Sequence, residues 1–127
     1  MTIYAACALV FNKTNEVLCV SRKHRPDDLG LPGGKIILGE TPEMAFKREL
    51  YEETGVIANE FYKLYEGVDP FNLKVCITYY VHSFEGEPKQ MEPGIFVSWQ
   101  PFEALLQPHC TFASYNKLLF EYVSGTM

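Results

Sequence analysis

The chain has 127 residues, of which 47% are hydrophobic, and a formal net charge of −5. A chain of this length can bury one core but not two, so we expect a single domain over residues 1–127. The acidic balance argues against nucleic acid as a partner, because binding a phosphate backbone needs a basic surface.

The first third of the chain predicts two strands and a loop. Residues 2–12 are an apolar run typical of a strand, and residues 17–23 look like the returning arm of a hairpin. No basic stretch followed by a long apolar segment occurs at this end, so we expect neither a signal peptide nor a membrane span, and a cytoplasmic protein. Residues 24–40 contain prolines and glycines that favour a loop.

Residues 41–54 carry the clearest helix signal. Thr41 is a suitable N-cap, Pro42 fits the first helical position, and Gly55 can end the helix in a left-handed conformation. The apolar side chains and the charged ones fall on different faces, so we expect an amphipathic helix.

The remaining segments alternate between strands and helix. We expect strands at residues 60–67, 72–84 and 95–99, a helical turn at 101–106 and a C-terminal helix at 111–123. Strands, a charged helix, more strands and a second helix indicate an α+β or α/β sandwich. The four cysteines are far apart and sit mostly in apolar runs, which favours free thiols.

Three glutamates of the predicted helix share one face. Glu49, Glu52 and Glu53 stand at i, i+3 and i+4, where like charges destabilise a helix. An ordinary solvated acidic face is one interpretation. The other is a platform for a hard divalent cation, because carboxylate oxygens are the ligands that Mg²⁺ prefers. The glycines just upstream, Gly33 and Gly34, would let backbone atoms approach the same point.

The spacing of a wider set of residues decides between the two interpretations. From residue 34 onward the chain follows G-x5-E-x7-R-E-U-x-E-E-x-G-U, where U is aliphatic. This pattern resembles the Nudix box at every defining position. The matching residues are Gly34, Glu40, Arg48, Glu49, Leu50, Glu52, Glu53, Gly55 and Val56.

The resemblance implies a fold and a chemistry. The fold would be a Nudix-type αβα sandwich, an α+β arrangement with a mixed sheet, a catalytic helix at 41–54 and a C-terminal helix. The activity would be hydrolysis of a nucleoside diphosphate linked to another group, with Mg²⁺ or Mn²⁺. By position, Glu49, Glu52 and Glu53 would be metal ligands together with the carbonyl oxygen of Gly33, and Arg48 would orient a glutamate. One glutamate would activate water; we favour Glu49, and the choice stays open.

The expected substrate rests on weaker similarities to MutT-like members of the family. The LPGGK loop resembles that of MutT-like proteins, in which a basic residue near the end of the second strand helps hold the nucleotide. Arg22, with Lys23 beside it, stands at that place. We therefore expect the substrate to be a small-molecule nucleotide, namely a nucleoside triphosphate, and oxidised purine nucleotides are included. We expect the protein to hydrolyse it to monophosphate and pyrophosphate. Many small Nudix proteins are dimers, so a homodimer is one alternative for the oligomeric state, which this sequence does not determine.

Other substrates stay open at this point. They are ADP-ribose, a dinucleoside polyphosphate, an RNA 5′ end and dihydroneopterin triphosphate; a non-catalytic nucleotide sensor is a further alternative. Two positions depart from the MutT-like pattern, because Ile37 and Ile95 stand where a further glutamate and a distal carboxylate are frequent. Glu85 and Glu92 are the nearest substitutes for the second of these.

Overall fold

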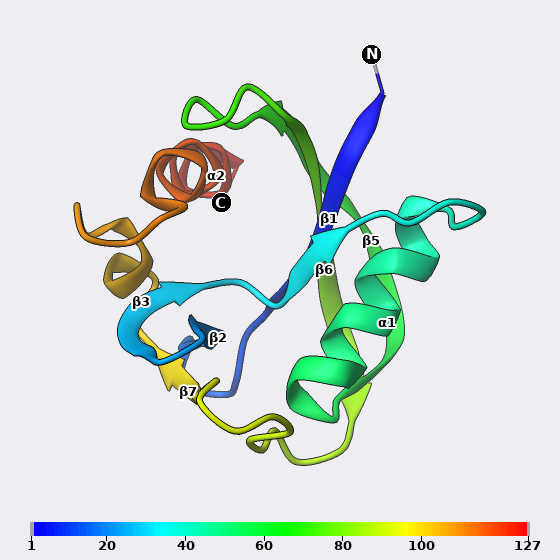
Figure 1. Cartoon of the computed structure of the whole chain (residues 1–127), viewed down its shortest axis with the longest axis vertical. Coiled ribbons are helices and arrows are strands. Elements are labelled where there is room, and N and C mark those ends of the chain that lie inside the picture. Colours follow the sequence, from blue (N-terminus) through cyan, green and yellow to red (C-terminus); the bar gives the residue numbers. More distant parts are fainter. Residues whose placement is uncertain (1, 127) are drawn as a thin grey trace.

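The computed structural model describes residues 2–126 and shows a mixed α+β fold, as expected. Helices α1 (Pro42–Thr54) and α2 (Ala113–Thr126) lie on opposite sides of a four-stranded sheet (Figure 1). A three-stranded sheet and a 3₁₀ turn (Phe102–Leu106) complete the fold. The first sheet has the order β4 (Gly33–Lys35), β1 (Ile3–Val10), β6 (Val75–Glu85), β5 (Ile57–Val68), and the second has the order β3 (Arg25–Gly30), β2 (Val17–Arg22), β7 (Val97–Gln100).

The four-stranded sheet is mixed, because β1 and β6 run parallel while the other neighbours are antiparallel. The expected hairpin of β1 and β2 is wrong: a single bridge, Phe11 to Val17, joins them, and the two strands enter different sheets. β1 is buried on both faces, so it takes the central place between β4 and β6.

The expected loop at 24–40 is wrong in part, since it contains two short edge strands. β3 pairs with β2, and β4 pairs with β1 through Gly33 and Gly34. Glycine and proline weaken a strand but are tolerated at sheet edges, where one side of the backbone needs no partner. The partner strands therefore decide the conformation of this segment.

The helix predicted at 41–54 is confirmed together with its caps. Thr41 Oγ1 accepts a hydrogen bond from the Met44 N–H at 3.2 Å. Gly55 ends the helix with φ of 78°, and its N–H donates to the Tyr51 carbonyl at 2.9 Å. The C-terminal helix and the turn near 101–106 are confirmed as well.

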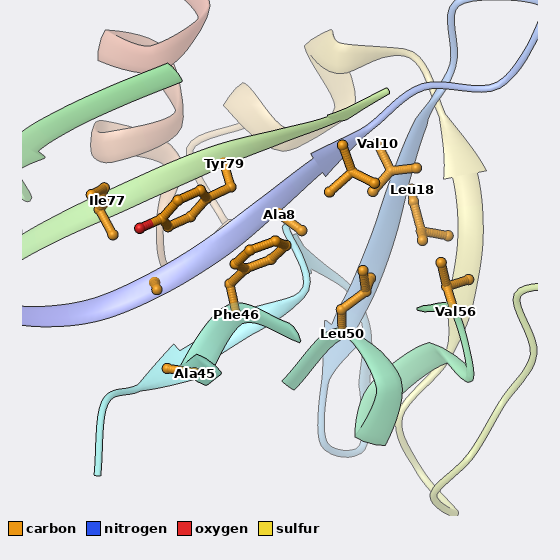
Figure 2. Close-up of a cluster of buried hydrophobic side chains, with 11 residues drawn as sticks. Ala8, Val10, Leu18, Ala45, Phe46, Leu50, Val56, Ile77 and Tyr79 are labelled. Atoms are coloured by element: carbon orange, nitrogen blue, oxygen red, sulfur yellow. The ribbon is translucent and has the colours of Figure 1, made fainter. Parts of the chain in front are cut away.

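Packing against the sheet fixes how α1 is rotated. Phe46 and Leu50 are fully buried against β1 and β6 (Figure 2), and the Phe46 ring stacks on Tyr79 with centroids 4.5 Å apart. Each such side chain contributes about 1.5–3 kcal/mol by leaving water. With this face held inward, the glutamates lie on the flanks of the helix, toward the edge strand β4.

The opposite face of the sheet packs against α2. Thr78, next to Tyr79 on β6, points to this side, and its Oγ1 lies 2.8 Å from the Tyr115 hydroxyl of α2. The alternation of side chains along β6 thus connects the sheet to both helices. Within residues 2–126, no helix is long and apolar enough to cross a membrane.

Candidate active site

Arg48 lies at the centre of a charged network on α1. Its Nε donates to Glu40 Oε2 at 2.7 Å and its Nη2 to Glu40 Oε1 at 3.1 Å. Its Nη1 donates to Glu49 Oε1 at 2.7 Å and to Glu52 Oε1 at 3.1 Å. The hydrogen bonds between Arg48 and Glu40 raise the pKa of the guanidinium and lower that of the carboxyl. Arg48 therefore joins three glutamates, with Glu40 fixing its orientation by a two-point contact.

Glu53 reaches from α1 to the edge strand β4. The Gly33 N–H donates to its Oε1 at 3.1 Å. Burial, and next the hydrogen-bonded carboxyl of Glu49, raise the pKa of Glu53 to about 9. In the metal-free protein the Glu49–Glu53 pair thus keeps a proton near neutral pH, because two carboxylates this close cannot both ionise easily.

The two glycines of β4 leave no room for side chains. A Cβ on Gly33 would lie 2.5 Å from the Cys7 Cβ, and a Cβ on Gly34 would lie 2.7 Å from the Glu49 carboxyl carbon. Glycine at both places lets the β4 backbone pass between β1 and the glutamates of α1. The carboxyl groups and the backbone of β4 consequently lie in direct contact.

The donor chemistry fits a hard divalent cation. The candidate donors are carboxylate oxygens and a backbone carbonyl, which are ligands suited to Mg²⁺. A bound cation could take the place of the proton on Glu53 and offset the repulsion between the ionised carboxylates of Glu49 and Glu53. Among residues 2–126, however, no three acidic, cysteine or histidine side chains stand ready as a metal-binding cluster. Arg48 Nη1 donates to both Glu49 and Glu52, and the Glu52 side chain is 58% exposed, so the three glutamates are not gathered at one point in the metal-free protein.

A cavity of about 480 Å³ adjoins this edge, on the face of the sheet that α2 covers. Gly33 and Gly34 line it, so the glutamates lie just across the edge strand. Arg22 also lines it, with its guanidinium carbon 5.4 Å from the centroid of the Phe112 ring. Lys23 does not line it and pairs with Glu92, Nζ to Oε1 at 3.4 Å. The fold brings Arg22, but not Lys23, to the glycine edge.

Several residues of the cavity were not predicted as site residues from the sequence. Asp69 and Lys74 come from the turn between β5 and β6, while Tyr115 and Asn116 come from α2. Segments so far apart meet only through tertiary packing. The alternation of side chains along β1 and β6 could have placed Cys7 and Cys76 on the same face; their Sγ atoms are 4.0 Å apart.

All four cysteines are free, as expected.

The two departures from the MutT-like pattern lie in loops. The Ile37 side chain is exposed, while its N–H donates to Glu40 Oε1 at 3.1 Å. The Ile95 N–H donates to the carbonyl of Glu92, whose carboxylate is paired with Lys23. Glu85, the other expected substitute, is exposed at the end of β6 and makes no ion pair with another of residues 2–126.

Comparison with known proteins agrees with this geometry. A family model of the NUDIX domain matches residues 1–122. The chain is 31% identical to an 8-oxo-dGTP diphosphatase of Haemophilus influenzae over 126 residues, which covers 94% of this chain and 93% of that protein. It is 37% identical to an 8-oxo-dGTP diphosphatase of Escherichia coli over 101 residues, covering 73% and 78% respectively.

The solved structures give the same answer. The crystal structure of a MutT NUDIX hydrolase from Burkholderia pseudomallei superposes with a TM-score of 0.74 at 30% identity, covering 97% of this chain and 99% of that one. The fold is that of a Nudix hydrolase. The chain belongs to the Nudix family of hydrolases. These enzymes generally use divalent metal ions and act on small nucleotide substrates.

Proposed function

We propose that the protein is a Mg²⁺-dependent pyrophosphohydrolase that cuts nucleoside triphosphates, oxidised purine nucleotides among them, to monophosphate and pyrophosphate. The observation that carries this proposal is the contact between cavity and glutamates. Gly33 and Gly34 line a cavity large enough for a nucleotide and also touch Glu53 and Glu49. The two 8-oxo-dGTP diphosphatases at 31% and 37% identity support the substrate class.

The proposed roles follow from the contacts. Glu49, Glu52, Glu53 and the Gly33 carbonyl would hold Mg²⁺ (or Mn²⁺), and Arg48 would keep Glu49 in place through its 2.7 Å hydrogen bond. The metal, when bound, supplies charge neutralisation for the phosphates and lowers the pKa of a bound water. Glu49, lying beside Glu53, would accept the proton of the attacking water.

The substrate would lie in the cavity with its phosphates toward the glycine edge. Arg22 and Lys35 both line the cavity and carry positive charge that suits phosphate oxygens. Lys23 remains a weaker candidate, since it would have to leave Glu92 to reach a phosphate. We also propose that residues 1–127 are one Nudix domain; homodimer formation and a cytoplasmic location stay predictions.

The test is a hydrolysis assay with purified protein, Mg²⁺ and a panel of substrates that includes dGTP, 8-oxo-dGTP, dATP and ADP-ribose. We expect triphosphates to be hydrolysed to monophosphate and pyrophosphate, and turnover to stop when the metal is chelated. In ¹⁸O-labelled water the label should enter the monophosphate, as attack at the phosphorus nearest the nucleoside requires.

Two results would contradict parts of the proposal. Label in pyrophosphate would mean attack at the β-phosphorus, which gives the same two products and overturns only the expected point of attack. Turnover of ADP-ribose with no turnover of any triphosphate would favour the activity of a Methanocaldococcus jannaschii ADP-ribose pyrophosphatase, to which the chain is 44% identical over 50 residues.

A further inference from the structure

Asp69 is a buried carboxylate at the end of the cavity away from the glutamates. It follows β5, at the start of the turn that leads into β6, and only 5% of its surface is exposed. β1 and β6 lie between this turn and the glycine edge of β4 in the sheet. A nucleotide whose phosphates lie at the glycine edge can reach Asp69 with its base, because both places line the same cavity.

One oxygen of Asp69 is held by the protein and the other is not. Oδ1 accepts a hydrogen bond from the Phe71 N–H at 2.8 Å. Within residues 2–126, Oδ2 accepts no hydrogen bond and Asp69 forms no ion pair. No fully covered polar side-chain atom in this part of the chain lacks a partner. Some surface of Oδ2 is therefore accessible to solvent, and Asp69 lines the cavity.

A ligand that fills the cavity takes the place of the water around Asp69 Oδ2, so it has to supply hydrogen-bond donors there. An ionised carboxylate only accepts hydrogen bonds, and leaving it buried without donors is costly. Guanine is the common base that offers two adjacent donors, N1–H and the 2-amino group, on one edge. Adenine and cytosine place a bare ring nitrogen beside their amino group, and that nitrogen would repel the carboxylate. Aromatic rings of Phe112 and Tyr115 in the same cavity suit the flat face of a base.

We propose that Asp69 recognises the N1–H and 2-amino edge of a guanine-type base, and so selects guanine over adenine nucleotides. This inference rests on the proposed function, because it takes the cavity to be the nucleotide site. The same edge occurs in a pterin ring, so guanine and pterin triphosphates share the chemistry that Asp69 would recognise. Oxidation at C8 lies on the other side of guanine, beyond the reach of a group that holds the 2-amino edge.

The variant Asp69→Asn replaces the acceptor at the Oδ2 position by a hydrogen-bond donor. The Phe71 N–H needs an acceptor, so the amide oxygen takes the place of Oδ1 and the NH₂ group takes the place of Oδ2. A donor then faces the 2-amino edge of guanine, while adenine gains a partner for its N1. We expect the kcat/KM ratio of dGTP to dATP to fall about 10–100-fold, the range typical of losing a specific hydrogen-bonded contact to a base edge.

Two further ratios separate this role from a general loss of activity. dITP lacks the 2-amino group of dGTP. The ratio of kcat/KM for dGTP to kcat/KM for dITP should be well above one in the wild type and should fall toward one in Asp69→Asn. The ratio of 8-oxo-dGTP to dGTP should not change. Asp27→Asn is the matched control, because Asp27 is exposed and does not line the cavity; all three ratios should stay at their wild-type values.

Several outcomes would overturn the inference. A wild type that hydrolyses dGTP and dITP equally well, or an Asp69→Asn variant that keeps the wild-type preference for guanine, would remove Asp69 from base recognition. A different result is that the protein turns over dihydroneopterin triphosphate faster than dGTP, with both rates equally lowered by Asp69→Asn. That result would support the edge contact and would identify the natural ligand as a pterin instead of guanine.

The proposed function can fail separately from the role of Asp69. If the wild type hydrolyses none of these triphosphates, GMP and IMP binding measured by calorimetry decides the inference instead. Tighter binding of GMP that is lost in Asp69→Asn would support it, and equal binding of GMP and IMP would overturn it.

Discussion

Glu53 holds a proton in the metal-free protein at the place where we propose that Mg²⁺ binds. Its pKa of about 9 results from burial and from the nearby Glu49, and the Gly33 N–H compensates only in part. A glutamine has the same shape as the protonated acid: its oxygen can accept from Gly33 and its NH₂ group can donate to Glu49. The folded protein should therefore tolerate glutamine at this position. A cation should bind this glutamine much more weakly than an ionised Glu53.

We predict that Glu53→Gln leaves the free energy of unfolding of the metal-free protein near pH 7 within about 0.5 kcal/mol of the wild type. Turnover should fall at least about 100-fold, since a lost ligand weakens charge stabilisation in the transition state. Melting curves should show that added Mg²⁺ stabilises the wild type more than the variant. Glu121→Gln, on the exposed side of α2, is the control. Near-normal turnover of Glu53→Gln would exclude this residue from the metal site.

At the scale of elements, the sequence predicts what local chemistry determines. Thr41, Pro42 and Gly55 mark the ends of α1 because caps depend on residues within one turn. The box spacing likewise predicts which glutamates share a face, since helical periodicity is local. β4 and the separation of β1 from β2 could not be predicted this way, because pairing partners distant in sequence determine them. The place of Asp69 in the cavity could not be predicted for the same reason.

The short strand β4 gives a prediction at this scale, through Gly34→Ala. The added Cβ would lie 2.7 Å from the Glu49 carboxyl carbon, and a flexible side chain can give way without unfolding the sheet. We expect a folded protein in which Glu49 is displaced and activity falls about 100-fold, as a misplacement near 1 Å can cause.

Gly125→Ala is the control for Gly34→Ala, since nothing lies within 4 Å of the added Cβ in α2. Circular dichroism and kcat measured on both variants test the prediction. Unchanged kcat in Gly34→Ala would show that the position of Glu49 is not critical.

The whole molecule carries a net charge of −5, yet its proposed substrate is an anion. Positive charge is concentrated locally instead: Arg22, Lys35 and Lys74 line the cavity, and a divalent cation would add to them. The walls of this cavity come from both sheets and from α2, so their relative placement decides its shape. Asp28 is one residue that fixes this placement, because it connects β3 to the segment that leads into α2.

Asp28 accepts hydrogen bonds from the Thr111 N–H at 2.8 Å and the Thr111 hydroxyl at 2.6 Å, with Arg25 at 3.5 Å. Burial opposes ionisation of Asp28, but the Thr111 donors and the nearby arginines outweigh it and lower the pKa of this carboxyl. A lowered folded-state pKa gives stability that is present above the ordinary Asp pKa of about 3.9 and is lost as the pH falls through the folded-state value. We predict that Asp28→Asn destabilises the protein by about 1–2 kcal/mol at pH 7, as expected for a charged hydrogen bond made neutral.

The dependence of the unfolding free energy on pH below neutrality tests the role of the Asp28 charge more sharply than a measurement at a single pH. Denaturant unfolding of wild type and Asp28→Asn should give free energies that differ fully above about pH 5 and converge as the pH falls, because protonation then removes the same charge from the wild type. Asp27→Asn, at the adjacent and exposed position, should follow the wild-type curve throughout. A constant difference between Asp28→Asn and the wild type down to pH 2 would mean that the variant is destabilised by lost packing and not by the lost charge on Asp28.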